Sequence, residues 1–133
     1  MRFIDTNIII RFLTDDVPEK ADACEEVFKR EARKDERVFI TDLVVAEIVW
    51  VLESVYGLSK KEIQDKVEKI LNTPNLFCLH KDIILGALIL YAEKDIDFID
   101  AYNALILKEK GIKELYSYDR HYEQIEWLTR LEP

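Results

Sequence analysis

Hydrophobic and polar residues follow one another in blocks that predict short strands separated by longer helices. Short apolar runs rich in β-branched and aromatic residues predict strands at 2–5, 37–40, 76–79 and 115–118, with a fifth at 127–128. Apolar residues at helical spacing predict helices over 6–13, 16–34, 42–56, 60–72, 81–93 and 99–110. Because helices separate the strands, we expect a mostly parallel sheet covered by helices on both faces.

Several helix ends carry recognisable capping residues. Pro18 stands at an early helical position, where its missing N–H is harmless. Thr41 or Asp42 caps the third helix, and Ser59 begins a capping box with Glu62. The third helix is apolar nearly all round, which predicts that it is either central or covered by another chain.

Four acids stand beside apolar segments at widely separated turns: Asp5, Glu47, Asp100 and Asp119. Isolated acids in apolar runs are costly unless they are paired or bound to a metal. Ligands of parallel sheets collect at the carboxyl ends of the strands, where these acids are expected to converge. Glu47 and Asp100 are expected in the first turns of helices that begin at this edge. Two bare carboxylates about 4 Å apart repel by roughly 4 kcal/mol at an effective dielectric of 20. A hard cation removes that penalty, which predicts a Mg²⁺ or Mn²⁺ site for phosphoryl chemistry.

Each acid also has a purely structural interpretation. Asp5 could cap the helix that follows it, and Asp119 could be an ordinary turn residue. Glu47 could form one buried salt bridge. Asp97 is expected to cap the helix that carries Asp100, and the four acids together favour a site over these separate roles.

Two asparagines refine the predicted site. Asn103 lies three residues beyond Asp100 and therefore on the same helix face. Asn7 stands where aspartyl-phosphate phosphatases carry a second acid, so a covalent aspartyl mechanism lacks its general acid. No Ser or Cys sits at a nucleophile elbow, and the three glycines form no phosphate-binding loop.

Composition sets the broad class of protein. A chain of 133 residues, 49% hydrophobic and 35% charged, predicts a single globular domain over 1–133. A net charge of −8 argues against tight, nonspecific binding of nucleic acid and suits a basic partner. The acid at Asp5 disfavours a signal peptide, and no apolar run could span a bilayer, so we expect a soluble, cytoplasmic protein without membrane contact.

Cys24 and Cys78 lie far apart and are expected to be small buried side chains. A disulfide is disfavoured in a reducing compartment. Cys78 and His80 alternate on one predicted strand, but two ligands do not make a zinc site. Abundant Lys and Glu lean towards a thermophilic source.

Taken together, the motifs resemble those of the PIN domain family, and within it the toxin ribonucleases of VapBC toxin–antitoxin pairs. The resemblance covers nearly the whole chain. It is carried by Asp5-Thr6-Asn7-Ile8 with Arg11-Phe12-Leu13, Glu47 with Trp50-Val51-Leu52 and Tyr56-Gly57-Leu58-Ser59, Asp97-Phe98-Ile99-Asp100-Ala101, and Ser117-Tyr118-Asp119-Arg120.

The resemblance implies a three-layer α/β/α sandwich with a central, mostly parallel sheet of four to five strands. It also implies an endoribonuclease dependent on Mg²⁺ or Mn²⁺, with a small antitoxin as partner and a homodimeric state. The acidic and metal-binding centre would be Asp5, Glu47, Asp100 and Asp119, with Asp97 as a more variable acid. In-line attack of water would leave a 3′-hydroxyl and a 5′-phosphate on the cleaved RNA.

Further roles follow from the same resemblance. Asn7 and Ser117 would orient the ligands, and Ser117 stands where the family often has Thr. Arg11 and Arg120 are candidates for phosphate contact. Two alternatives stay open: an RNA-processing PIN nuclease without an antitoxin, and a PIN-like binding module that has lost catalysis.

Overall fold

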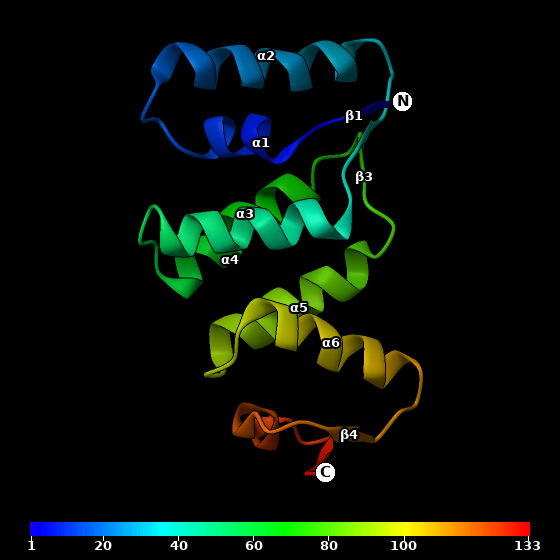
Figure 1. Cartoon of the computed structure of the whole chain (residues 1–133). Helices are drawn as coiled ribbons and strands as arrows, with labels where there is room; N and C mark the ends of the chain where they lie inside the picture. The colour runs from blue at the N-terminus through cyan, green and yellow to red at the C-terminus, as the bar shows by residue number, and fades with distance from the viewer. The chain divides into compact units, whose positions relative to one another are not determined.

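Two units, Met1–Lys81 and Asp82–Pro133, make up the chain, and the computed structural model describes all of its residues, 1–133 (Figure 1). The first unit contains β1 (Arg2–Phe3), α1 (Thr6–Leu13), α2 (Pro18–Arg33), β2 (Val38–Phe39), α3 (Asp42–Ser54), α4 (Lys60–Leu71) and β3 (Leu76–Phe77). At the unit boundary begins α5 (Lys81–Glu93), which is followed by α6 (Phe98–Glu109), β4 (Glu114–Tyr116), the 3₁₀ helix η1 (Arg120–Gln124) and β5 (Thr129–Leu131).

All strand pairs are parallel, as predicted, but the ladders are short. In the first unit the strand order is β1-β2-β3, with Val38 opposite both Arg2 and Leu76. In the second unit β4 pairs with β5. The predicted sheet of four to five strands is therefore smaller than expected, with ladders of three and two strands. The strands end early because Asp5 and Thr41 already serve as helix N-caps.

The fifth strand was predicted at the wrong residues. It runs over Thr129–Leu131 and not over 127–128. Leu128 lies in a turn, where its N–H donates to the carbonyl oxygen of Ile125 over 3.1 Å. The apolar pair at 127–128 is instead used for packing, since Leu128 is buried and the Trp127 indole N–H donates to the Ala104 carbonyl over 3.0 Å.

The predicted caps of α3 and α4 are confirmed. The Thr41 hydroxyl accepts from the Val44 N–H over 3.2 Å, and the Ser59 hydroxyl accepts from the Glu62 N–H over 3.2 Å. Pro18 is the first residue of α2, and Gly57 follows α3 with a left-handed φ of 63°. These local hydrogen bonds satisfy donors that the first helical turn leaves free.

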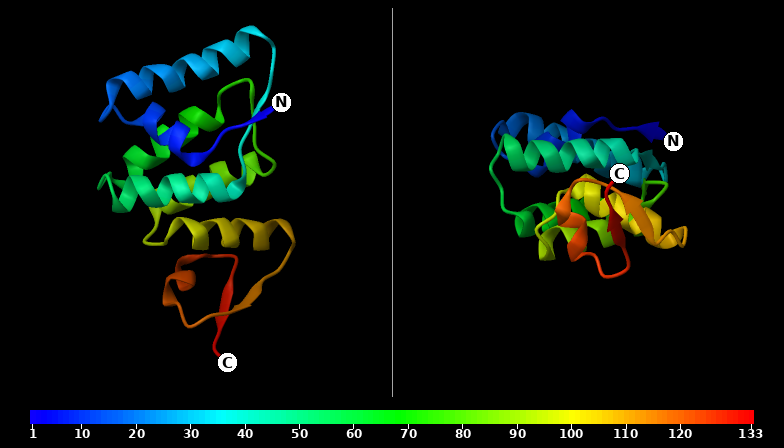
Figure 2. Two further views of the ribbon diagram at one scale, coloured as in Figure 1. Left: turned by 45° about the horizontal axis from the view of Figure 1, so that its top comes forward. Right: turned by 60° about the horizontal axis from the view of Figure 1, so that its bottom comes forward.

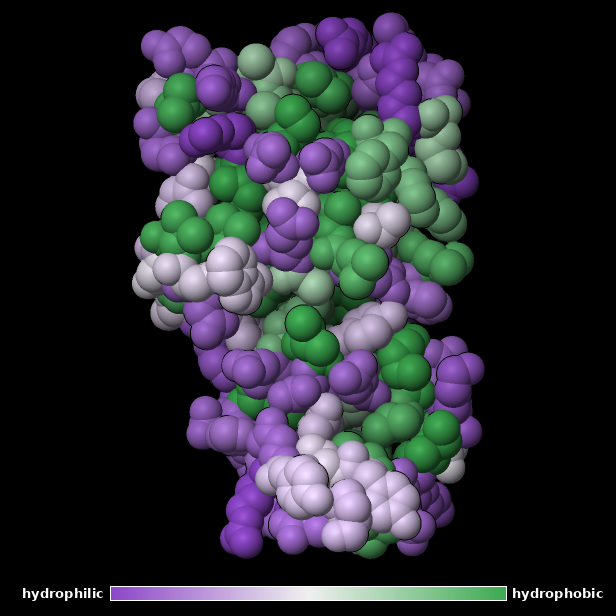
Figure 3. Space-filling view, in the orientation of Figure 1, coloured by the Kyte–Doolittle hydropathy of each residue, from purple (hydrophilic) through white to green (hydrophobic).

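The helices of the first unit pack against one another around α1 and α3. Helix α1 lies along α2, as both views of Figure 2 show, and it also contacts α3, which packs against α4. One face of α3 is fully buried in this core, through Val44, Val45, Ile48, Val49 and Leu52. The opposite face leaves Leu43 81% and Trp50 64% exposed. Patches of apolar surface accordingly lie among polar ones on the face shown in Figure 3.

In the second unit the core forms where α5 meets α6. The inward residues predicted for α5 are all buried, namely Ile84, Ala87, Leu88 and Tyr91. The Tyr91 ring meets Phe98 edge-on, with ring centroids 6.2 Å apart. A Cβ on Gly86 would lie 3.2 Å from the Leu105 Cδ1 of α6, so this glycine permits the close approach of the two helices.

Both cysteines are free and buried, which confirms their predicted place in the core. Burial, above all, raises the pKa of the Cys78 thiol to about 11. None of the helices is long and apolar enough to cross a membrane.

Gly57→Ala should lower the free energy of unfolding by about 1 kcal/mol, because a Cβ disfavours the left-handed backbone. No heavy atom lies within 4 Å of the position that this Cβ would take, so crowding adds nothing. Urea denaturation measures the change. Gly57→Asn is the control and should lose less, because Asn tolerates this conformation. Equal stability of Gly57→Ala and the unmodified chain would contradict the prediction.

Candidate functional site

Two of the predicted site acids, Asp100 and Asp119, meet in the second unit. Asp100 lies in the first turn of α6 and is half-buried, and Asp119 is the N-cap of η1. Burial raises the pKa of Asp100, the Tyr122 hydroxyl opposes that rise, and the carboxylates of Asp119 and Asp97 add to it. The two carboxyl groups are within hydrogen-bonding reach, and this contact raises the pKa of Asp100 while lowering that of Asp119. The contact therefore favours the charged form of Asp119 over that of Asp100.

Protein donors fix one oxygen of each carboxyl group in this pair. The Tyr122 hydroxyl donates to Oδ1 of Asp100 over 3.0 Å. Oδ1 of Asp119 accepts from the backbone N–H of His121 over 2.9 Å and lies 2.6 Å from its ring Nδ1. The backbone N–H of His121, first, and then its ring lower the pKa of Asp119, while Asp119 raises the pKa of His121. The Ser117 hydroxyl accepts from the backbone N–H of Asp119 over 3.0 Å.

Asp97 and Asn103 extend this group along α6. Asp97 holds the N-cap position, as predicted, but its side chain accepts no capping hydrogen bond. Its exposed carboxylate instead adds to the negative field at Asp100. Asn103 lies on the same side of α6 as Asp100, where it hydrogen-bonds Tyr122.

The other two predicted acids, Asp5 and Glu47, belong to the first unit. Asp5 is exposed and follows β1, and its Oδ1 accepts from the N–H of Thr6 over 2.8 Å, so it does cap α1. Glu47 is the sixth residue of α3 and not in the first turn as expected. It is exposed beside Leu43 and Trp50, with no ion-pair partner, so the buried salt bridge considered for it is wrong. The buried apolar residues next to Glu47 in the sequence, such as Val45 and Ile48, lie on the other face of the helix, so they did not imply that Glu47 is buried.

No three His, Cys, Asp or Glu side chains lie together in a geometry that could hold a metal ion. The structure thus brings together Asp100 and Asp119, with Asp97 close by. In the first unit, the sequence neighbours Asp5 and Thr6 are joined by the capping hydrogen bond, and Glu47 is exposed on α3. The donor set still suits a hard cation, because carboxylate oxygens are the ligands that Mg²⁺ and Mn²⁺ prefer. Two carboxyl groups in contact are also a local excess of negative charge that a cation would relieve.

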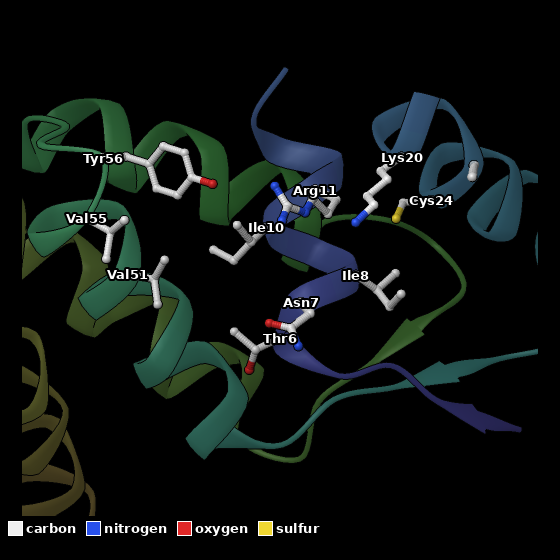
Figure 4. A pocket seen from close by; sticks show the side chains of 11 residues that line it. Thr6, Asn7, Ile8, Ile10, Arg11, Lys20, Cys24, Val51, Val55 and Tyr56 are labelled. Atoms are coloured by element: carbon white, nitrogen blue, oxygen red, sulfur yellow. The ribbon is translucent and has the colours of Figure 1, made fainter. Parts of the chain in front are cut away.

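A pocket of about 610 Å³ opens beside α1 in the first unit (Figure 4). Its lining includes the predicted site residues Asn7 and Arg11, together with Lys20 and Tyr56. Arg11 lies 3.1 Å from the carboxylate of Asp16, which also accepts from the Tyr56 hydroxyl over 2.8 Å. The charge of Arg11 is therefore already balanced within the chain.

The second candidate for phosphate contact, Arg120, is exposed at the start of η1. Arg130, above all, lowers the pKa of Glu123, and the charge of Arg120 adds to this effect. The phosphate roles of Arg11 and Arg120 stay predictions.

At the end of β3, His80 and Cys78 both meet Asp42 at the start of α3. His80 Nδ1 lies 2.5 Å from Asp42 Oδ2, and the Cys78 thiol donates to Asp42 Oδ1 over 3.6 Å. These contacts tie the carboxyl end of β3 to α3 and so help to place the helix that carries Glu47.

Sequence reasoning missed the roles of Tyr122 and His121 as partners of the acids. Both lie in η1: His121 is two residues after Asp119, and Tyr122 is three residues after it. The spacing of a 3₁₀ turn allows such contacts, but no residue pattern after Asp119 predicted a turn there.

The fold is of the α/β class with parallel strands. A comparison with known protein families identifies the family. A model of the PIN domain family matches residues 2–128, so this chain belongs to the PIN domain family. The resemblance drawn from the motifs and the predicted PIN-like fold are thereby confirmed.

Two known proteins are similar to the chain. A protein named VapC ribonuclease from Aquifex aeolicus (strain VF5) is 30% identical over 129 residues, which cover 97% of this chain and 95% of that protein. The crystal structure of VapC20 from Mycobacterium tuberculosis, described as a Sarcin-Ricin loop cleaving toxin, aligns with a TM-score of 0.44 at 18% identity. That alignment covers 100% of both chains.

Asp100→Asn should abolish most of the thermal stabilisation that Mn²⁺ gives, without lowering the melting temperature in chelator. Amide replacement removes the negative charge at this position but keeps an oxygen to accept from Tyr122. A metal at roughly one hundred times its Kd stabilises the folded state by about 2.7 kcal/mol. Differential scanning calorimetry with Mn²⁺ and with EDTA measures both quantities.

Asp22→Asn is the matched control, since it makes the same charge change at an exposed position of α2. It should respond to Mn²⁺ as the unmodified chain does. An equal response of Asp100→Asn would remove Asp100 from the site.

Proposed function

We propose that this chain is a divalent-metal-dependent endoribonuclease and the toxin of a toxin–antitoxin pair. Membership of the PIN domain family and the likeness to a VapC ribonuclease over nearly its full length support the proposal. The observation that carries it is the meeting of Asp100 and Asp119, whose carboxyl groups lie within hydrogen-bonding reach. Such a pair is costly at Asp100, because burial and the neighbouring carboxylate of Asp119 both disfavour its charged form.

We propose Asp5, Glu47, Asp100 and Asp119 as the catalytic, metal-binding acids. Each has features that suit the role: Asp5, Asp100 and Asp119 have one oxygen fixed by a protein donor, and Glu47 is exposed without an ion-pair partner. The family match runs through both units, which supports a single nuclease domain over 1–133.

The remaining polar residues would orient these acids or contact the phosphates of the RNA. When bound, Mg²⁺ or Mn²⁺ lowers the pKa of water and shields the phosphate charge. Ser117 holds the backbone of Asp119, so it fixes where that carboxylate lies. Asn7 is exposed in the first turn of α1, two residues beyond Asp5. Arg11 would contact phosphate only if its pairing with Asp16 opened, and Arg120 would do so directly.

The proposed protein partner is a small antitoxin. A basic segment suits the net charge of −8, and exposed apolar residues on α3, Leu43 and Trp50, would need covering beside Glu47. Because its substrate would be RNA of the cell, we propose that the chain acts in the cytoplasm. We also propose that the chain is a homodimer.

Asp5→Asn should lower the rate of RNA cleavage by about 100-fold or more, because outer partners of metal ligands alone are worth 10- to 100-fold. Cleavage of total RNA with Mg²⁺, with Mn²⁺ and with EDTA, followed on denaturing gels, measures the rates. EDTA should abolish the activity of the unmodified chain. Asp22→Asn, again the charge-matched control, should cleave at the unmodified rate.

Cleavage that persists undiminished in EDTA would reject the proposed metal dependence. A chain that binds Mn²⁺ but cleaves no RNA would instead be a binding module. Active protein whose expression leaves growth unaffected in the absence of any antitoxin would favour RNA processing over a toxin role.

Light scattering should give a mass of two chains of 15.7 kDa each at micromolar concentration. Oligomers of this kind bury apolar surface that a monomer would expose. A mass of one chain across the accessible concentration range would contradict the homodimer.

A further inference from the structure

We propose that Tyr122 is a positioning residue that holds the carboxylate of Asp100 for metal binding through its hydroxyl group. The inference rests on the proposed function, because it assigns a role to Tyr122 only if Asp100 is a metal ligand. Tyr122 is not one of the acids, and its side chain would not touch the RNA or the metal in this role.

The inference depends on two successive hydrogen bonds that connect three side chains in the second unit. Asn103 hydrogen-bonds the Tyr122 hydroxyl group, which in turn donates to Oδ1 of Asp100 over 3.0 Å. A hydroxyl group has one proton to donate. Since that proton points to Asp100, the Asn103 amide must supply the donor of the other contact. The directions of both hydrogen bonds are then fixed.

The position of Tyr122 in η1 links the two acids that meet here. Asp119 caps η1, and the N–H of Tyr122 lies 3.4 Å from the Asp119 carbonyl oxygen. The same turn thus holds Asp119 through His121 and Asp100 through Tyr122. One short segment thereby sets the separation between two carboxyl groups that come from different elements.

The ring and the hydroxyl group of Tyr122 contribute separately. The Tyr122 side chain is only 6% exposed, so its ring fills the core near Ile125, as phenylalanine could. The hydroxyl group instead donates to a half-buried carboxyl group of the proposed metal site, and this contact fixes where Oδ1 of Asp100 lies. Donors that orient metal-ligating side chains are worth about 10- to 100-fold in metal affinity. The contact therefore gives more to a metal site than to the packing.

The test is the Mn²⁺ dissociation constant of the full chain and its variants, measured by electron paramagnetic resonance of free Mn²⁺ at pH 7. Tyr122→Phe should bind Mn²⁺ about 10-fold more weakly than the unmodified chain. Its melting temperature in EDTA should change little, because the ring is retained. In the Asp100→Asn background, Tyr122→Phe should cause no further loss, since the two residues act as one unit.

Tyr56→Phe is the matched control, because it also removes a tyrosine hydroxyl that donates to an aspartate, Asp16, over 2.8 Å. Asp16 is not among the proposed ligands, so the affinity for Mn²⁺ should stay unchanged. Asn103→Ala is a second variant on the exposed side of the chain of contacts. It should weaken Mn²⁺ binding in the same direction, by less than Tyr122→Phe.

The outcomes separate the inference from the function on which it rests. If the unmodified chain binds Mn²⁺ and Tyr122→Phe binds it equally well, the positioning role is wrong while the metal site stands. If the unmodified chain binds no Mn²⁺, both are wrong. Should Tyr122→Phe fail to fold in EDTA, Asn103→Ala decides, and an affinity equal to that of the unmodified chain overturns the role.

Discussion

Repulsion between carboxylates is the interaction on which this account depends. Asp100 and Asp119 approach closely enough for each to shift the pKa of the other in opposite directions. Two ionised carboxyl groups in contact repel each other even at the moderate effective dielectric of a protein surface. The fold nevertheless supplies hydrogen bonds that keep both groups in place, from Tyr122 to one and from His121 to the other. Carboxyl groups that are kept in contact although their charges repel are characteristic of functional sites, and a bound cation would offset the repulsion.

The surrounding structure explains how this arrangement is maintained. Helix α6 packs against α5 through a glycine at the contact, and the turn η1 fixes Asp119 at its cap. In the first unit, Asp5 begins α1 directly after a strand, and Asp42 ties α3 to the end of β3. Asp5, Asp100 and Asp119 therefore stand at the starts of helical elements, where short backbone segments restrict their movement. Sites on such elements are more precise than sites on loops.

Sequence alone predicted the element order well and the contacts less well. Caps such as Thr41 and Ser59 and the left-handed Gly57 are local signals, so the helix boundaries could be read from the chain. The extent of strand pairing depends on where the chain leaves the sheet, and it was overestimated. Glu47 shows the limit most clearly, because its apolar neighbours in sequence lie on the buried face of α3 while it is exposed. The contact of Tyr122 with Asp100 joins residues 22 positions apart and required the turn at η1.

The most direct measurement is anomalous X-ray diffraction from crystals of the chain grown with Mn²⁺. We expect one or two anomalous peaks bounded by carboxylate oxygens of Asp5, Glu47, Asp100 and Asp119, at about 2.0–2.3 Å as is usual for small divalent cations. Well-ordered crystals in which Mn²⁺ occupies other positions, with Asp100 and Asp119 facing each other without an ion, would contradict it.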